Sequence, residues 1–365
     1  MIVEMNMNII DYTRVAAKSD SFDNHERVSL IQDTESGLQA IIAIHNTNLG
    51  PAVGGCRMFP YSSVDAALED VLRLSKGMTY KSAVAGLPMG GGKAVIIGDP
   101  SSDKSDALLQ KMGQFIESHD GKYVTAEDSG MCVNDLKVMA SQTSYVLGIE
   151  AEQEYGGDPS PLTAMGIFIG IEAAVKHKLG RNTLQGVRVA MQGAGSVGQH
   201  LIKQLMAAGA VVSVSDINQE NLDAARALGA SIVDVEQIFS EDADVFCPCA
   251  MGGIINDHTI SQIVAPIIAG GANNQLALPR HANLLKQRGI LYAPDFVINA
   301  GGIIEICRQL KNESMSLSHT KISEIGMTLS EIFGKSDHSK ASTAEIAEQL
   351  AEQRFMSDQA KPNAA

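Results

Sequence analysis

The chain has 365 residues, a formal net charge of −14, 45% hydrophobic residues and 19% charged residues. This length is large for a single core, so we expect two domains. The negative charge argues against nucleic acid or an anionic membrane as a partner, because both require basic patches. The sequence starts without a basic region followed by an apolar run, and no segment is long enough to span a bilayer, so a cytoplasmic protein is expected.

Five cysteines form no disulfide framework, and an odd number suits a reducing compartment. Cys247 and Cys249 are separated by one residue, which is the wrong spacing for a Cys-x-x-Cys zinc or redox pair. None of the nine histidines forms a His-x-x-x-His pair. We therefore expect no metal site. The cysteine pair is interpreted as core packing, with metal ligation as the weaker alternative.

The N-terminal half alternates predicted strands and helices, which indicates an open α/β sheet. Its first 24 residues are weakly patterned and are expected to form an edge segment or a frayed arm. A buried one-sided helix is predicted after Ser62 or Ser63, either of which can cap it. The predicted elements are strand 40–45, a loop over 50–55, helix 64–78, helix 105–118 and a short strand over 123–130.

Three consecutive glycines, Gly90 to Gly92, precede Lys93 and an apolar run that a Gly-Asp-Pro turn ends. Glycines are costly in regular elements, so we predict a sharp turn close to a ligand, with Lys93 at the start of a strand. A glycine-rich turn followed by a solvated lysine explains the glycines alone equally well. Lys81 after the preceding helix and Asp128 after a short strand favour a site, because two lysines and an aspartate suit an α-amino or α-keto acid.

The C-terminal half begins after a run of helix breakers near 148–161, where we expect a hinge. A helix over 163–178 is followed by strand 187–192, a Gly-x-Gly-x-x-Gly turn and an amphipathic helix. Such a turn lets a pyrophosphate approach the N–H groups of a helix N-terminus, and an acid after the next strand binds ribose. The residues predicted to bind a dinucleotide are Gly193, Gly195, Ser196, Val197, Gly198 and Asp216.

Asp216 also predicts which dinucleotide binds. A carboxylate there accepts a hydrogen bond from the ribose 2′-hydroxyl and repels a 2′-phosphate. No lysine or arginine lies between Asp216 and Arg226, so NAD is favoured over NADP. Four further strands are predicted at 245–247, 267–270, 291–292 and 297–299, then helices over 322–333 and 344–355 and a disordered tail from 357. Strands that alternate with helices predict a parallel sheet with its ligand at the strand carboxyl ends.

Several of these segments, with their order and spacing, resemble motifs of the glutamate/leucine/phenylalanine/valine dehydrogenases, and within that family the leucine-specific branch. They are residues 50–58, 76–81, 90–93 and 126–128. The resemblance, which extends from Glu35 to Phe355, implies a two-domain α/β enzyme with a cleft between the domains. Residues 1–148 would form the substrate-binding and oligomerisation domain, to which a C-terminal helix over 335–365 returns. Residues 149–334 would form a Rossmann-type, doubly wound NAD domain.

The resemblance also implies a reaction. It is the reversible NAD-dependent oxidative deamination of an L-amino acid to a 2-oxo acid and ammonia, in a homo-oligomer that is often an octamer. Lys81 would bind the substrate α-carboxylate, Lys93 would be the general base toward water, and Asp128 would relay protons at the amine. A lysine is a base at neutral pH only when a nearby cation or a water-poor site lowers its pKa, so deamination should accelerate on the alkaline side.

The family's side-chain pocket maps onto apolar positions of this chain, where an unpaired second carboxylate would be costly to bury. A branched aliphatic substrate (leucine, valine or isoleucine, unranked) is therefore expected. The pocket positions are Val53, Gly54, Met78, Ala126, Ile303 and Ile306. The positions implied to contact the nicotinamide or the polar end of the substrate are Thr163, Ala250, Asn274 and Asn299.

Alternatives remain open at this point. Ile303 and Ile306 are equally well explained as helix core, and their bulk mildly disfavours an aromatic substrate such as phenylalanine or tryptophan. A catalytically inactive NAD-binding sensor is disfavoured because a pure binder needs no base. Residues 129–132, Ser-Gly-Met-Cys, depart from the family's usual Val-Gly-Thr, which leaves details of the cleft open.

Overall fold

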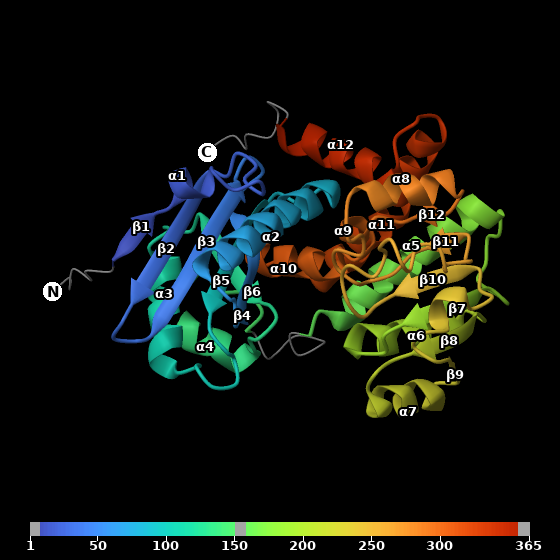
Figure 1. Ribbon diagram of the computed structural model, residues 1–365, viewed down its shortest axis with the longest axis horizontal. Coiled ribbons are helices and arrows are strands. Elements are labelled where there is room, and N and C mark those ends of the chain that lie inside the picture. Colours follow the sequence, from blue (N-terminus) through green and yellow to red (C-terminus); the bar gives the residue numbers. More distant parts are fainter. Residues whose placement is uncertain (1–7, 150–157, 357–365) are drawn as a thin grey trace. The chain divides into compact units, whose positions relative to one another are not determined.

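A computed structural model describes residues 8–149 and 158–356, which form two compact units (Figure 1). Most of the predicted hinge and all of the predicted disordered tail lie outside these residues. Each unit combines segments that are distant in the chain. The first unit contains the described residues 8–149, 309–312 and 352–356, and the second contains 158–308 and 313–351.

The first unit contains a six-stranded mixed sheet in the order β1-β2-β3-β5-β4-β6. The pairs β1–β2, β2–β3 and β3–β5 are antiparallel, whereas β4 is parallel to both β5 and β6. This arrangement confirms the predicted α/β sheet, with β1 as an edge strand near the N-terminus. The strands are β1 Ile9–Asp11, β2 Arg27–Asp33, β3 Leu38–Asn46, β4 Ala52–Phe59, β5 Gly90–Ile97 and β6 Tyr123–Glu127.

Helices cover both faces of this sheet because alternate residues of its strands are apolar. Ile41 of β3 joins a core cluster with Leu68 and Leu72 of α2. Its neighbour Ile42 joins the cluster of the opposite face, with residues of α3 and α4. Ser63 caps α2, its side chain accepting a hydrogen bond from the Ala66 N–H. The helices are α1 Thr13–Ala16, α2 Val64–Val84, α3 Asp106–Glu117 and α4 Val133–Ala140.

The glycine triplet differs from its prediction. Gly90 to Gly92 are the first residues of β5 and not a turn, so Lys93 is its fourth residue. A Cβ at Gly90 would lie 2.0 Å from the Asn46 carbonyl oxygen, and one at Gly91 would lie 2.0 Å from the Thr79 nitrogen. The glycines therefore let β3 and α2 approach β5 closely. The predicted loop over 50–55 is likewise wrong from Ala52 onward, where β4 begins.

The second unit contains a parallel six-stranded sheet in the order β12-β11-β10-β7-β8-β9. Numbered from β7, this is the order 3-2-1-4-5-6 of a doubly wound dinucleotide-binding fold, as predicted. The strand order reverses between β7 and β10, where such folds bind their ligand. The strands are β7 Arg188–Gln192, β8 Val211–Ser215, β9 Ser231–Ile232, β10 Val245–Pro248, β11 Ile267–Ile268 and β12 Leu291–Tyr292.

The last predicted strand, 297–299, is wrong. Residues Asp295–Ile298 form the short helix α9 after Pro294, and the Val297 N–H donates to the Pro294 carbonyl. The β-branched pair favours a strand locally, but the preceding proline and aspartate are helix-start residues. The predicted C-terminal helices are confirmed as α11 and α12. The helices of this half of the chain are α5 Ser160–Leu179, α6 Ser196–Ala207, α7 Gln219–Ala227, α8 Arg280–Gln287, α10 Gly301–Lys311, α11 Met315–Asp337 and α12 Thr343–Met356.

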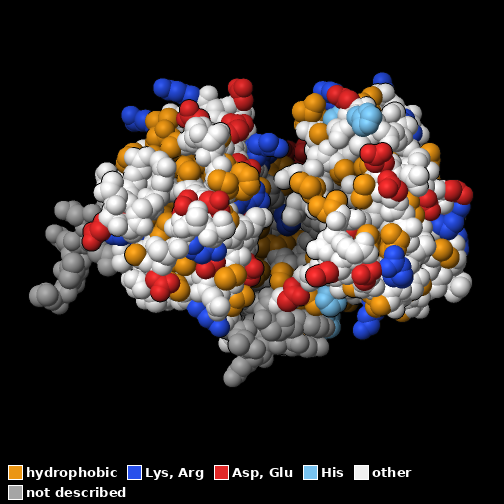
Figure 2. Space-filling view, turned by 60° about the horizontal axis from the view of Figure 1, so that its bottom comes forward, with side chains coloured by type: hydrophobic (Ala, Val, Ile, Leu, Met, Phe, Trp, Pro, Cys, Tyr) orange, Lys and Arg blue, Asp and Glu red, His pale blue; other side chains and the backbone are white. Residues whose placement is uncertain are grey.

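The end of α12 belongs to the first unit and contacts α2 there. The Tyr80 hydroxyl donates to a Glu352 carboxylate oxygen at 2.8 Å, and the Arg354 guanidinium donates to the Ala83 and Val84 carbonyls at the end of α2. On the surface, acidic and basic side chains are interspersed over the visible face of both units (Figure 2). Across 8–149 and 158–356, every helix is too short or too polar to cross a bilayer.

Candidate active site

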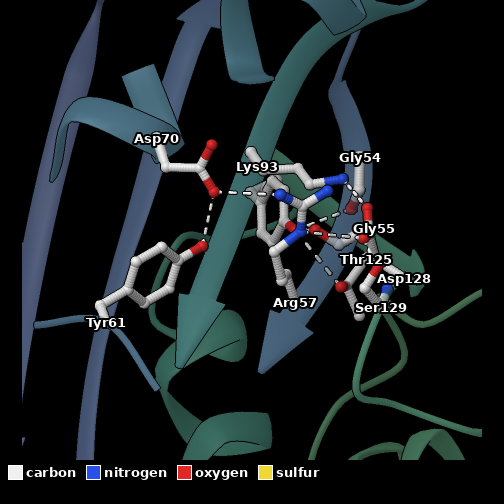
Figure 3. A network of polar contacts seen from close by, with 10 residues as sticks. Gly54, Gly55, Arg57, Tyr61, Asp70, Lys93, Thr125, Asp128 and Ser129 are labelled. Carbon is white, nitrogen blue, oxygen red and sulfur yellow. Dashed lines mark hydrogen bonds and ion pairs between the residues drawn. The ribbon is translucent and has the colours of Figure 1, made fainter. Parts of the chain in front are cut away.

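A buried ion pair lies at the carboxyl end of β6 in the first unit. Lys93 is only 4% exposed, and its Nζ donates to Oδ2 of Asp128, the residue that follows β6 (Figure 3). The intervening strand β4 presents Gly54 and Gly55 at this point. A Cβ at Gly54 would lie 1.8 Å from the Gly92 carbonyl oxygen, and one at Gly55 would lie 2.8 Å from the Asp128 Cβ. Gly54 therefore lets β4 lie close to β5, and Gly55 leaves room for the Asp128 side chain.

Arg57 of β4 is the second cation beside Asp128. Its Nε donates to Asp128 Oδ1 at 3.1 Å, and its Nη1 donates to Asp70 Oδ2 of α2 at 3.0 Å (Figure 3). The Tyr61 hydroxyl donates to the same Asp70 oxygen at 2.6 Å. Sequence reasoning gave no role to Arg57, Asp70 or Tyr61. A signal was present, because Arg57 is the one charge in the strand Ala52–Phe59.

Asp128 is held in its ionised form. Burial by itself would raise the pKa of this carboxyl, but the Lys93 and Arg57 cations outweigh burial and hold the pKa well below its usual range. The Ser129 N–H also donates to Oδ1 at 2.6 Å. Asp128 is therefore a permanent anion at neutral pH, with separate partners on its two oxygens.

The C-terminal part of α2 packs against the glycines of β4 and β5. The half-buried Met78 has its Cγ 3.4 Å from the position of a Cβ at Gly54, and Thr79 lies against Gly91. Lys81 lies half-buried in the last turn of α2. The buried Val53 and Ala126 lie on β4 and β6, and Ala126 pairs with Gly55. Four of the predicted pocket residues thus gather around β4: Val53, Gly54, Met78 and Ala126.

The predicted glycine turn of the second unit connects β7 to α6. Gly193 has φ +96°, and a Cβ there would lie 2.8 Å from Ala250, so only glycine fits. A Cβ at Gly198 would lie 2.6 Å from the Gly193 carbonyl oxygen, whereas a Cβ at Gly195 would meet nothing within 4 Å. The backbone at Gly195 is therefore open to a ligand at the N-terminus of α6, while Gly193 and Gly198 shape the turn.

Asp216 follows β8 and is fixed against the same turn. Its Oδ2 accepts the Ala194 N–H at 2.7 Å and its Oδ1 accepts the Asn218 N–H at 2.8 Å. Burial opposes ionisation of this carboxyl, but the backbone N–H groups outweigh burial and lower its pKa. The ionised carboxylate therefore lies beside the turn, as the predicted ribose contact requires.

Asn299 presents a buried polar atom without a partner at the carboxyl edge of this sheet. Its Nδ2 donates to the Gly271 carbonyl at 3.1 Å and to Asn273 Oδ1 at 2.8 Å, but no hydrogen bond to its Oδ1 is present. Such an atom is costly unless a ligand or water satisfies it. Together with the open turn at Gly195, it fits a dinucleotide bound at this edge.

The remaining predicted residues lie on three elements of the second unit. Thr163 lies on α5, with its Oγ1 3.0 Å from the position of a Cβ at Gly302. Asn274 has φ +52° in the loop after β11, and its carbonyl accepts the Gly253 N–H. On α10, Ile303 is buried and Ile306 is half-buried. The structure does not bring these four into a single hydrogen-bonded group.

The cysteine pair lies at the end of β10, with Cys247 in the strand and Cys249 directly after it. Cys247 is fully buried, and its Sγ lies 3.6 Å from the Cys249 Sγ. Within the described residues, no group of three or more His, Cys, Asp or Glu side chains is arranged to hold a metal ion.

The doubly wound sheet of the second unit, with its glycine turn and fixed acid, has the architecture of a dinucleotide-binding domain, and the first unit adds the buried Lys93–Asp128 pair, an arrangement that suits a two-domain dehydrogenase. Comparison with known proteins identifies the family. The family model for the Glu/Leu/Phe/Val dehydrogenase dimerisation domain matches residues 25–145, and that for Glutamate/Leucine/Phenylalanine/Valine dehydrogenase matches 158–220 and 218–360. The chain belongs to this family of NAD(P)-dependent amino acid dehydrogenases.

Individual relatives are similar to this chain over almost its whole length. A leucine dehydrogenase from Geobacillus stearothermophilus is 47% identical over 333 residues, 91% of each chain. A phenylalanine dehydrogenase from Lysinibacillus sphaericus is 46% identical over 330 residues, 89% of this chain and 87% of that one. The crystal structure of L-tryptophan dehydrogenase from Nostoc punctiforme matches with a TM-score of 0.80 and 40% identity, covering 91% of this chain and 96% of that one.

Proposed function

We propose that this enzyme catalyses the reversible NAD-dependent oxidative deamination of a branched-chain L-amino acid (leucine, valine or isoleucine) to its 2-oxo acid and ammonia. The observation that carries the proposal is the buried Lys93–Asp128 pair, with the uncharged residues Val53, Gly54, Met78 and Ala126 on or beside the strand β4 that lies between them. Similarity to a leucine dehydrogenase at 47% identity supports the aliphatic substrate. In this proposal, the first unit, which includes the end of α12, binds substrate, and the second unit binds NAD.

The chemistry divides among three side chains of the first unit. Lys81 at the end of α2 binds the α-carboxylate of the substrate. Lys93, once deprotonated, accepts a proton from the water that attacks the imine carbon. Asp128 is ionised beside Lys93 in the resting site, so it can accept a proton from the substrate amine and return it to the departing ammonia. Because the lysine base must lose its proton first, deamination accelerates on the alkaline side.

The second unit holds the cofactor in this proposal. NAD, when bound, would supply the acceptor for the hydride of the substrate α-carbon. The turn formed by Gly193, Gly195, Ser196, Val197 and Gly198 would hold its pyrophosphate. The Asp216 carboxylate, held by two backbone N–H groups, accepts the ribose 2′-hydroxyl and would repel a 2′-phosphate. The residues proposed around the nicotinamide and the substrate are Thr163, Ala250, Asn274, Asn299, Ile303 and Ile306.

An aromatic substrate is the second candidate. The phenylalanine dehydrogenase at 46% identity and the L-tryptophan dehydrogenase structure are nearly as similar to this chain as the leucine dehydrogenase is. The predicted pocket positions of the first unit are uncharged and do not by themselves distinguish leucine from phenylalanine. Relative rates on these two amino acids decide between the candidates.

The test is a panel of amino acids with NAD and with NADP, followed by the absorbance of the reduced cofactor. Replacing the base, Lys93→Ala, should lower deamination about 10²–10⁴-fold. Lys104→Ala is the matched control, because it removes another Lys–Asp pair of the first unit, that with Asp135 at 2.7 Å, and should keep its activity. Intact turnover in Lys93→Ala would refute the catalytic assignment.

We further infer a homo-oligomer. The matching family model is described as a dimerisation domain, and it covers residues 25–145. Analytical ultracentrifugation of the purified enzyme gives the number of subunits, and a monomer at micromolar concentration would contradict this inference.

A further inference from the structure

The Arg57 network contains two charged side chains, Arg57 and Asp70, that the chemistry proposed above does not use. Its four charged members come from separate parts of the first unit: Arg57 from β4, Asp70 from α2, Lys93 from β5 and Asp128 from the loop after β6. The guanidinium lies between two carboxylates, at 3.1 Å from Asp128 Oδ1 and 3.0 Å from Asp70 Oδ2 (Figure 3). Three of these four side chains are a quarter or less exposed, so the arrangement is more than a surface ion pair.

We propose that Arg57 is a positioning residue for deamination: anchored by Asp70, it binds one oxygen of Asp128 and so keeps the other oxygen directed at Lys93. The inference rests on the proposed function, in which Lys93 and Asp128 act on the substrate. It adds to that function a residue that touches neither the substrate nor the cofactor and acts through Asp128.

The geometry explains why an arginine is needed. Asp128 follows the end of a strand, where the Ser129 N–H and Arg57 hold its Oδ1 and Lys93 holds its Oδ2. Arg57 donates to two carboxylates from two different nitrogens, Nε and Nη1, in the fixed geometry of a planar guanidinium, whereas a lysine has one nitrogen to share between them. Tyr61 holds the anchor itself, because its hydroxyl donates to the same Asp70 oxygen that accepts from Arg57.

The charges of the network balance. Arg57 and Lys93 are cations, and Asp70 and Asp128 are anions. The other titratable groups around them are uncharged or paired: burial raises the pKa of the Cys56 thiol to about 12 and keeps Tyr61 and Tyr123 neutral, and Asp135 pairs with Lys104. Removing one charge of the network therefore leaves a net charge beside the catalytic pair.

This balance predicts opposite effects of two substitutions. Arg57→Met leaves two carboxylates facing one ammonium, so the base holds its proton more tightly and the rise of kcat/KM with pH moves about one pH unit higher. Asp70→Asn leaves excess positive charge, so the same rise moves lower. Both variants lower kcat, because each loosens Asp128. Arg57→Lys keeps the charge and should restore the native pH profile while kcat stays low.

A second measurement does not depend on turnover. Because the pKa of Asp128 is held low in the folded state, its ionisation stabilises the fold above about pH 4, and that contribution is lost as the pH falls further. The gap in Tm between the native protein and Arg57→Met should therefore be widest near neutral pH and narrow below about pH 4. Arg188→Met is the matched control, because Arg188 also contacts two aspartates, Asp242 and Asp244, at the opposite end of β7 from the glycine turn.

The outcomes separate the two proposals. If the native enzyme turns over no amino acid, the proposed function fails, whatever the variants do. If the native enzyme is active but Arg57→Met and Asp70→Asn shift the pH profile in the same direction or not at all, the positioning role of Arg57 is wrong. A Tm gap that stays constant with pH would overturn it in the same way.

Discussion

His119 shows how burial without a counter-charge changes the pKa of a titratable residue. It is 2% exposed, its Nδ1–H donates to the Phe115 carbonyl, and its Nε2 accepts from the Ser29 hydroxyl. Burial lowers the pKa of His119 from 6.5 to about 4. Asp128 is also buried, but the Lys93 and Arg57 cations keep it charged. The first unit thus buries two titratable groups in different ways: His119 is neutral, whereas Asp128 is charged and paired with cations.

The pKa of His119 predicts acid lability. Below pH 6.5 the unfolded chain binds a proton at this position that the folded chain does not bind until about pH 4, so the free energy of unfolding falls by about 3 kcal/mol over that range. His119→Gln should remove this part of the slope in denaturant unfolding at pH 6.5 and 4.5. The exposed His200→Gln is the control and should leave the slope unchanged. An unchanged slope in His119→Gln would contradict the assignment.

At the level of elements, two glycines of packed segments have opposite effects on stability. Gly91 of β5 is required, since a Cβ there would lie 2.0 Å from the backbone nitrogen of Thr79. Gly77 lies two residues before Thr79 in the exposed interior of α2, and a Cβ there would meet nothing within 4 Å. The first glycine is a packing requirement between strand and helix, whereas the second only weakens the helix.

These two positions form a matched pair for alanine substitution. Gly77→Ala should raise the free energy of unfolding by about 0.5–1 kcal/mol, because alanine favours a helix. Gly91→Ala should lower it by about 1–3 kcal/mol or more, because α2 must move away from β5. Chemical denaturation of both variants measures the difference. Equal effects of the two substitutions would show that close packing does not explain the glycine triplet.

The elements also show what sequence reasoning can predict here. The Gly193–Gly198 turn was predicted because its spacing between a strand and a helix is specific to one local geometry. The extended conformation of Gly90 to Gly92 could not be predicted in this way. It depends on contacts with Asn46, Thr79 and Tyr123, which are distant in the chain. The bridge from Arg57 to Asp70 and Asp128 was missed for the same reason, although a lone charge in an apolar strand indicated that a partner was needed.

At the scale of the whole molecule, the two units, each with its own sheet, are proposed to bind different ligands. The glycine turn and Asp216 belong entirely to the second unit, and Lys81, Lys93 and Asp128 belong entirely to the first. The charged groups proposed for each ligand therefore come from a single unit, although hydride transfer requires that the two ligands meet.

This division predicts where each ligand protects the backbone from hydrogen exchange. NAD alone should protect amides around Gly193–Gly198 and Asp216, because backbone N–H groups of the turn become hydrogen-bonded. A branched-chain 2-oxo acid, added with NAD, should extend protection to the end of α2 and to β5. Exchange followed by mass spectrometry measures both patterns. Protection by NAD confined to the first unit would contradict the division, and ADP-ribose serves as a control for contacts that do not involve the nicotinamide.

The contacts made by the end of α12 bear on how the protein is synthesised. Glu352 and Arg354 bind Tyr80 and the last carbonyls of α2, yet they lie some 270 residues later in the chain. The strands of the first unit are therefore translated well before these two partners are. The unit whose synthesis begins first thus lacks the contacts at the end of α2 until the second unit has also been translated.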